Sequence, residues 1–161
     1  SFFDGCKKLT SLGLPESLEV ISMAAFSECV LLKNVLSDTN GIRHVGTGAF
    51  TGCRELETVF FGSEDTAIMA GTYYGCDSIT EVTIPEGIQW IGSSAFANCV
   101  SLQSVTFSDT IEYIDPGAFT SCAKIVRITL PDSLLSIGDG AFAECSKLTE
   151  IDIPDLSLIH I

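Results

Sequence analysis

The residues of this sequence with the greatest capacity for chemistry are its seven cysteines, which recur at nearly constant intervals. Successive cysteines are 23 residues apart, except for one gap of 24 residues. Thiolates can bind metals, act as nucleophiles or pair into disulfides, and each of these roles needs partner residues that the spacing must supply. The cysteines are Cys6, Cys29, Cys53, Cys76, Cys99, Cys122 and Cys145.

The rest of the chain offers few partners for a metal site or a nucleophile. No C-x-x-C pair occurs, and the two histidines, His44 and His160, do not accompany the cysteine series. A catalytic serine or cysteine needs an oriented histidine within reach, and His160 lies in an irregular C-terminal segment. We therefore predict that the chain is not an enzyme and has no catalytic, metal-binding or cofactor-binding residues.

Disulfides and a ladder of small buried side chains are the two remaining interpretations of the cysteines. In stacked coils, equivalent Cα atoms would lie about 4.8 Å apart, within the range that a disulfide requires. Seven is an odd number, however, and stacked side chains point the same way instead of towards each other. We expect a buried structural ladder, because cysteine behaves as a small hydrophobic residue.

The cysteines belong to a repeat that runs through the chain. The consensus C-x-x-L-x-x-V-x-I-P-x-x-(L/I)-x-x-I-G-x-x-A-F-x-x recurs about seven times. One such unit cannot bury its apolar side alone, so successive copies must stack. An aromatic residue precedes each cysteine by three positions: Phe3, Phe26, Phe50, Tyr73, Phe96, Phe119 and Phe142.

Each unit predicts short extended segments and a turn. The L-x-x-V-x-I segment alternates apolar residues before proline or another breaker, which is typical of a strand, and strands that recur once per unit must pair in parallel. The (L/I)-x-x-I-G segment predicts a second extended or turn piece whose glycine allows a tight bend. The A-F-x-x-C segment predicts one helical or 3₁₀ turn. Residues 62–72 (GSEDTAIMAGT) depart from the consensus and predict an irregular third coil.

The units GAFTGCRELETVFF and GAFAECSKLTEIDIPD resemble the BspA-like, Treponema-pallidum-type leucine-rich repeats. The resemblance implies an α/β repeat fold, a curved right-handed solenoid with a parallel β-sheet on its concave face. Members of this family occur in surface and secreted proteins and are associated with adhesion and protein binding. The resemblance transfers no catalytic or binding residues.

We expect residues 1–154 to form one solenoid of about seven 23-residue repeats. The sequence starts inside a unit, without an initiating methionine or a signal peptide, and this predicts a fragment that is uncapped at both ends. Residues 155–161 (DLSLIHI) lose the repeat register. Two interpretations remain open for them, a degenerate final coil or an artefact that resembles translated adapter sequence.

Composition restricts the partners of the chain. Its 161 residues are 46% hydrophobic and 18% charged, which excludes intrinsic disorder. Eight Lys and Arg against 21 Asp and Glu give a net charge of −13, so we expect no nucleic-acid partner. No run reaches the roughly 18 apolar residues of a spanning helix, and we expect no membrane insertion within this segment.

Two pairs of apolar side chains are candidate contacts for a protein ligand. Leu36 and Phe60 occupy the same outward column of the first strand and should form an exposed patch, unless a loop or a register shift covers them. Trp90 and Tyr113 precede the closing isoleucine in adjacent units and should stack. Such aromatic residues are favoured in interfaces, although they also serve simply to cover an edge.

These features favour a non-enzymatic interaction or adhesion module that presents a rigid surface to a protein or glycoprotein ligand. The chain would belong to a larger protein, and the resemblance suggests a cell-surface or secreted location. The alternative function is a structural spacer with no ligand of its own. The two differ in that only a binding module depends on particular surface residues.

Overall fold

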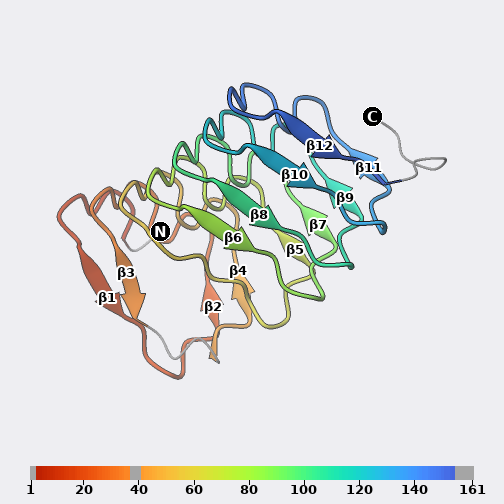
Figure 1. Ribbon diagram of the computed structural model, residues 1–161. Coiled ribbons are helices and arrows are strands. Elements are labelled where there is room, and N and C mark those ends of the chain that lie inside the picture. Colours follow the sequence, from red (N-terminus) through yellow and green to blue (C-terminus); the bar gives the residue numbers. More distant parts are fainter. Residues whose placement is uncertain (1–2, 37–40, 155–161) are drawn as a thin grey trace.

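A computed structural model shows that the chain winds into a parallel β-solenoid, with one turn for each sequence unit (Figure 1). The structure describes residues 3–36 and 41–154, apart from the side chain of Leu36. The segment 155–161, predicted to be out of register, lies outside the described residues. The predicted leucine-rich-repeat solenoid is thereby confirmed, since paired strands are one unit apart along the chain.

Each regular coil contributes two short strands, which form two columns along the solenoid (Figure 1). The first column arises from the L-x-x-V-x-I segment and consists of β1 (Ser11–Gly13), β3 (Asn34–Leu36), β6 (Glu81–Thr83), β8 (Ser104–Thr106), β10 (Arg127–Thr129) and β12 (Glu150–Asp152). The second column arises from the (L/I)-x-x-I-G segment and consists of β2 (Val20–Ile21), β4 (His44–Val45), β5 (Ala67–Ile68), β7 (Trp90–Ile91), β9 (Tyr113–Ile114) and β11 (Ser136–Ile137).

The strands pair in parallel, as their recurrence predicts. The first column forms the pairs β1–β3, β6–β8 and β10–β12, and the second forms the pair β2–β4 and the four-stranded sheet β5–β7–β9–β11. Register places like residues side by side, for example Val82 beside Val105 and Ile91 beside Ile114. Inward-facing aliphatic residues therefore stack into continuous buried rows.

The A-F-x-x-C segment forms a third side of each coil, made of turns. Backbone bonds of the i to i+3 kind close it, such as Cys99 N–H to Phe96 O at 3.2 Å, and the described residues contain no α-helix. Residues with positive φ, such as Ser94 (55°) and Asn98 (60°), interrupt each turn before it can extend into a helix. Amides here also pair between coils, with Phe96 N–H donating to Ala118 O at 2.8 Å.

The glycines of the I-G motif are required by close packing between coils and not by a backbone conformation that favours glycine. Gly46, Gly92 and Gly138 do not have positive φ. A Cβ atom on Gly92 would lie 2.8 Å from the amide nitrogen of Ala70, and one on Gly138 would lie 2.4 Å from the nitrogen of Pro116. Only glycine fits here, because the atoms it approaches are the backbone of the preceding coil.

Aromatic rings fill the centre of the solenoid. The column that precedes the cysteines stacks continuously from Phe3 to Phe142, with ring centroids 5.3–5.5 Å apart and planes within 12° of each other. Its members from Phe50 to Phe119 are fully buried. This ladder links each described coil to the next and forms the central part of the core.

The third coil interrupts both strand columns. No strand forms at residues 58–60, where the repeat predicts one, and β4 does not pair with β5 within the described ranges. The expected irregularity of this coil is therefore confirmed. Two polar side chains compensate for the missing ladder bonds, as described below.

Candidate interaction surface

Trp90 and Tyr113 form the stacked pair that the sequence predicts. They are register partners on β7 and β9, their ring centroids are 4.4 Å apart and their planes differ by 25°. Trp90 is 42% exposed and Tyr113 is half-buried. Because each ring limits the rotation of the other, the pair presents an ordered aromatic surface to solvent.

Small residues flank this aromatic pair within the same column. Ala67 on β5 is the register partner of Trp90 on one side, and Ser136 on β11 is the partner of Tyr113 on the other. Tyr113 covers one face of the indole ring. The methyl group of Ala67 is too small to cover the second face, which explains the high exposure of Trp90.

Of the second candidate pair, Leu36 and Phe60, only the side chain of Phe60 is described, and it does not face outward as its column predicts. The backbone of Leu36 belongs to β3, but its side chain lies outside the described residues. Phe60 is half-buried, and its ring packs against Phe50 with centroids 6.0 Å apart. The expected orientation of Phe60 is wrong because the strand that would turn it outward is missing from the third coil.

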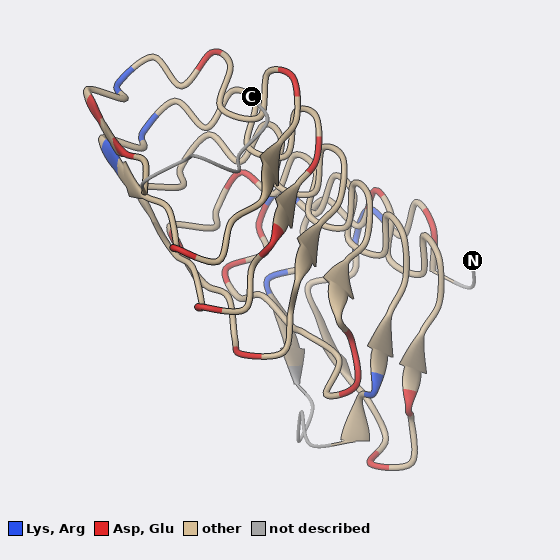
Figure 2. Ribbon diagram, turned by 90° about the vertical axis from the view of Figure 1, so that its right-hand side faces the viewer, with Lys and Arg blue, Asp and Glu red and all other residues tan. Residues whose placement is uncertain are grey.

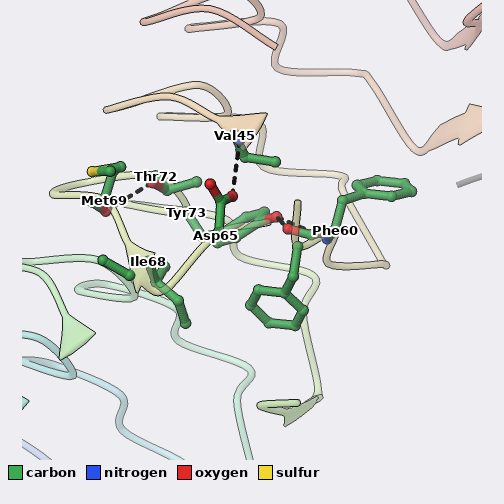
Figure 3. Close-up of a pocket in the computed structure, with 9 residues that line it drawn as sticks. Val45, Phe60, Asp65, Ile68, Met69, Thr72 and Tyr73 are labelled. Atoms are coloured by element: carbon green, nitrogen blue, oxygen red, sulfur yellow. Dashed lines mark hydrogen bonds between the residues drawn. The ribbon is translucent and has the colours of Figure 1, made fainter. Parts of the chain in front are cut away.

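The backbone of Phe60 is held by a side chain instead of a neighbouring strand (Figure 3). The hydroxyl of Tyr73 accepts a hydrogen bond from Phe60 N–H at 2.8 Å and donates one to the carbonyl oxygen of Phe60. Tyr73 is the single tyrosine of the buried aromatic column. Its hydroxyl thus satisfies the two backbone groups that a regular strand would have paired. The presence of tyrosine at a position where the other units have phenylalanine is the sequence signal that could have indicated this role.

A carboxylate performs the corresponding role in the second column. Asp65 Oδ2 accepts hydrogen bonds from Val45 N–H at 3.0 Å and from Gly62 N–H at 3.1 Å, and Oδ1 lies 3.0 Å from His44 Nδ1. The side chain of Asp65 is only 7% exposed. It stands where other units have a buried aliphatic residue such as Ile88. In place of hydrophobic contact, it supplies acceptors for amides that would otherwise lack partners.

Replacing Tyr73 by phenylalanine is expected to lower the free energy of unfolding by about 1–3 kcal/mol. The change keeps the stacked ring but leaves Phe60 N–H and C=O buried without a partner, which costs the desolvation of both groups. Urea unfolding followed by circular dichroism measures the effect. The matched control is Tyr74→Phe at the next position, because Tyr74 is 42% exposed and its hydroxyl can bond to water. Equal stability of the two variants would contradict this role of Tyr73.

The cysteines form a ladder of hydrogen bonds as well as a buried column. Six of the seven thiols, all but that of Cys6, donate to the carbonyl oxygen of the aromatic residue in the preceding coil, at 3.0–3.3 Å. The spacing of the cysteines predicts their burial but does not indicate these bonds. All seven cysteines are free thiols, and six are buried. The bonds run from Cys29 to Phe3, Cys53 to Phe26, Cys76 to Phe50, Cys99 to Tyr73, Cys122 to Phe96 and Cys145 to Phe119.

The buried thiols predict a loss of stability in alkali. Burial raises the pKa of Cys53 and of Cys99 from 9.0 to about 12. The unfolded chain releases these protons first, so stability is complete below about pH 9 and is lost as the pH rises towards about 12. Urea midpoints measured across this range should fall steadily. Cys53→Ala should make the urea midpoint fall less steeply with pH. An equally steep fall in this variant would contradict a contribution of the Cys53 thiol to the loss of stability.

The described part of the chain holds no group of three potential metal ligands. The gap beside Asp65, Phe60 and Tyr73 in the third coil measures only about 10 Å³, close to the space of one water molecule (Figure 3). It is a packing irregularity and not a ligand pocket. Within the described ranges, no helix is long and apolar enough to span a membrane.

Acidic residues are distributed along the solenoid and greatly outnumber basic ones (Figure 2). The described ion pairs with lysine or arginine involve Lys33, Arg43 and Arg127, which lie in coils on either side of the aromatic pair. The Arg43 guanidinium lowers the pKa of the Glu64 carboxyl by hydrogen bonding and charge. The surface around Trp90 and Tyr113 is consequently aromatic and negative.

The repeat spacing, the parallel strand columns and the buried aromatic ladder agree with a family match over residues 1–70 and 66–161. The matching family model describes a BspA-type leucine-rich repeat region, with six copies. The chain belongs to the BspA-type leucine-rich repeat family. No curated protein matches the sequence closely enough to count as a relative.

Solved structures of bacterial leucine-rich proteins share this fold. A leucine-rich cell surface protein from Faecalibacterium prausnitzii is 32% identical, with a TM-score of 0.81, over 89% of this chain and 38% of that protein. The Treponema pallidum leucine-rich repeat protein is 30% identical, with a TM-score of 0.79, over 91% of this chain and 68% of that one. A leucine-rich repeat protein from Bacteroides ovatus is 27% identical, with a TM-score of 0.70, over 94% of this chain and 50% of that one. The chain therefore spans half or less of two of these three proteins.

Proposed function

We propose that this repeat region is a protein-interaction module whose contact surface is the sheet β5–β7–β9–β11, with Trp90 and Tyr113 at its centre. The observation that carries the proposal is the exposed, stacked aromatic pair on adjacent strands. Its rings are ordered before any partner arrives, so binding would lose little side-chain entropy. Exposed Trp and Tyr side chains are also frequent energetic centres of interfaces.

The repeat region would act without catalysis, as part of a larger surface or secreted protein that adheres to a protein or glycoprotein ligand. The similarity to a cell surface protein from Faecalibacterium prausnitzii supports this location. Residues 1–154 would form the binding solenoid, and Leu36 would be a secondary contact. Phe60 has no part in this surface because its ring packs on Phe50.

A structural spacer is the second candidate function. The continuous aromatic and thiol ladders favour it, since they link the described coils and are independent of any surface residue. A spacer needs only this rigidity. A binding module needs Trp90 and Tyr113 in addition.

Affinity capture of cell-surface proteins with the double variant Trp90→Ala, Tyr113→Ala tests the proposed function. The matched control is Val100→Ala, Val126→Ala, which removes two other exposed apolar side chains. We expect the parent chain and the control to retain a common partner that the aromatic double variant loses. Capture of the same proteins by all three chains would show that the contact lies outside this aromatic pair, and capture of none would support the spacer instead. Circular dichroism must show that the three chains fold alike.

A further inference from the structure

The middle of the solenoid lacks positive side chains. Between Arg54 and Lys124 the sequence contains no lysine, arginine or histidine, but ten aspartates and glutamates. These residues span the coils that carry β5 to β9. The central coils therefore carry an excess of negative charge that their own side chains do not neutralise, and such a field attracts a cationic partner.

The ion pairs with lysine and arginine in the described residues involve few carboxylates of this central region. Lys33 pairs with Glu55 at 3.7 Å, Arg43 pairs with Glu64, and Arg127 pairs with Glu150 at 3.2 Å. Further carboxylates of the central coils have no described cation within 4 Å: Asp77, Glu81, Glu86, Asp109, Glu112 and Asp115. Much of the negative charge between β6 and β9 is thus available to a partner.

The aromatic pair lies inside this negative region. Glu112 is the residue immediately before β9, and Asp115 is the residue immediately after it. Both carboxylates are half-buried, which weakens the screening of their charge by solvent. The uncovered face of the Trp90 indole carries the negative end of its quadrupole, so it also attracts a cation.

We propose that the Trp90–Tyr113 surface binds arginine side chains of a basic polypeptide segment. This inference rests on the proposed function and specifies the class of partner. A guanidinium group is planar and stacks on an aromatic face, and it donates paired hydrogen bonds to a carboxylate, whereas an ammonium group acts as a point charge. A polypeptide with several arginines would also meet the carboxylates of neighbouring coils.

The fluorescence of Trp90 provides a direct test, because it is the only tryptophan in the sequence. The probes are short capped peptides that alternate arginine, lysine or glutamate with glycine. We expect the arginine peptide to change the emission in a saturable manner, the lysine peptide to bind several-fold more weakly, and the glutamate peptide to have no effect. Saturation by the glutamate peptide, or by arginine and lysine peptides equally, would overturn the assignment.

Substitutions then locate the binding site, with the anisotropy of a labelled arginine peptide as the readout. Trp90→Ala should weaken binding roughly tenfold, which is the effect of a partly desolvated cation–π contact. Asp115→Asn should weaken binding and reduce its salt dependence. Val126→Ala, which removes a comparably exposed side chain far along the sequence, should change nothing. Equal affinity of Trp90→Ala and the parent chain would overturn the proposal.

The failure of this inference can be distinguished from the failure of the proposed function. If captured partners depend on Trp90 and Tyr113 but the arginine peptide does not bind there, the surface binds a partner of different chemistry and only the inference is wrong. If no captured partner depends on the two aromatic residues, the proposed function fails. Binding of the arginine peptide that depends on Trp90 supports the inference.

Discussion

Replacing Phe96 by alanine is expected to lower the free energy of unfolding by about 3–5 kcal/mol. Phe96 is fully buried and stacks on both sides, with Tyr73 and Phe119 at 5.3 Å each. Its removal deletes the aromatic contact area and leaves a cavity between two coils. Because each repeat contacts only its neighbours, one gap in the ladder weakens two interfaces at once. Urea unfolding followed by circular dichroism measures the loss.

The matched control for this prediction is Trp90→Ala in the same unit. It removes an even larger aromatic side chain, but one that is 42% exposed, so we expect a loss of less than about 1.5 kcal/mol. A similar loss of unfolding free energy in both variants would mean that a ring in the buried ladder contributes no more to stability than a ring stacked at the surface. A broader transition in Phe96→Ala would indicate that the two halves of the solenoid unfold separately.

Gly138→Ala is expected to destabilise the fold by about 1–3 kcal/mol, as overpacking does. The added Cβ atom would lie 2.4 Å from the nitrogen of Pro116 and 2.7 Å from the carbonyl carbon of Asp115. Neither group can rotate away, because both belong to the backbone of the neighbouring coil. The coils must therefore separate locally, which weakens the pairing between β9 and β11. Thermal unfolding and urea unfolding both report this change.

Gly13→Ala provides the control, because a Cβ atom at this position in β1 meets nothing within 4 Å and φ is not positive. We expect it to leave stability unchanged or slightly higher, since alanine reduces the entropy of the unfolded chain. Equal destabilisation by the two substitutions would show that the cost comes from loss of glycine flexibility and not from contact between coils. The repeat places Gly138 in the recurring I-G motif and Gly13 outside it, but the contact made at Gly138 is visible only in the structure.

The irregular third coil has a consequence for the location of the candidate surface. It separates β2–β4 from the four-stranded sheet, so Trp90 and Tyr113 lie on the longest continuous sheet of the described residues. Asp65 and Tyr73 satisfy the backbone groups that the interruption leaves unpaired. The sheet that carries the aromatic pair can therefore begin at β5 without exposing unsatisfied amides in the core.

The sequence by itself determined the repeat, the parallel pairing, the buried cysteine and aromatic columns and the stack of Trp90 on Tyr113. Each of these follows from periodicity, because residues one unit apart must become neighbours when the units stack. The net charge and the absence of cations from the central coils are likewise readable from the sequence. No knowledge of exact geometry is needed for such inferences.

Only the tertiary structure decided the features that depend on departures from the repeat. Phe60 turns towards Phe50 because the strand at residues 58–60 does not form, and Tyr73 and Asp65 bond to the backbone where that regularity fails. The bonds from thiols to carbonyl oxygens and the close approach at Gly138 are also invisible in sequence, because they depend on distances between coils. Periodicity specifies which residues are neighbours, whereas packing specifies how their atoms meet.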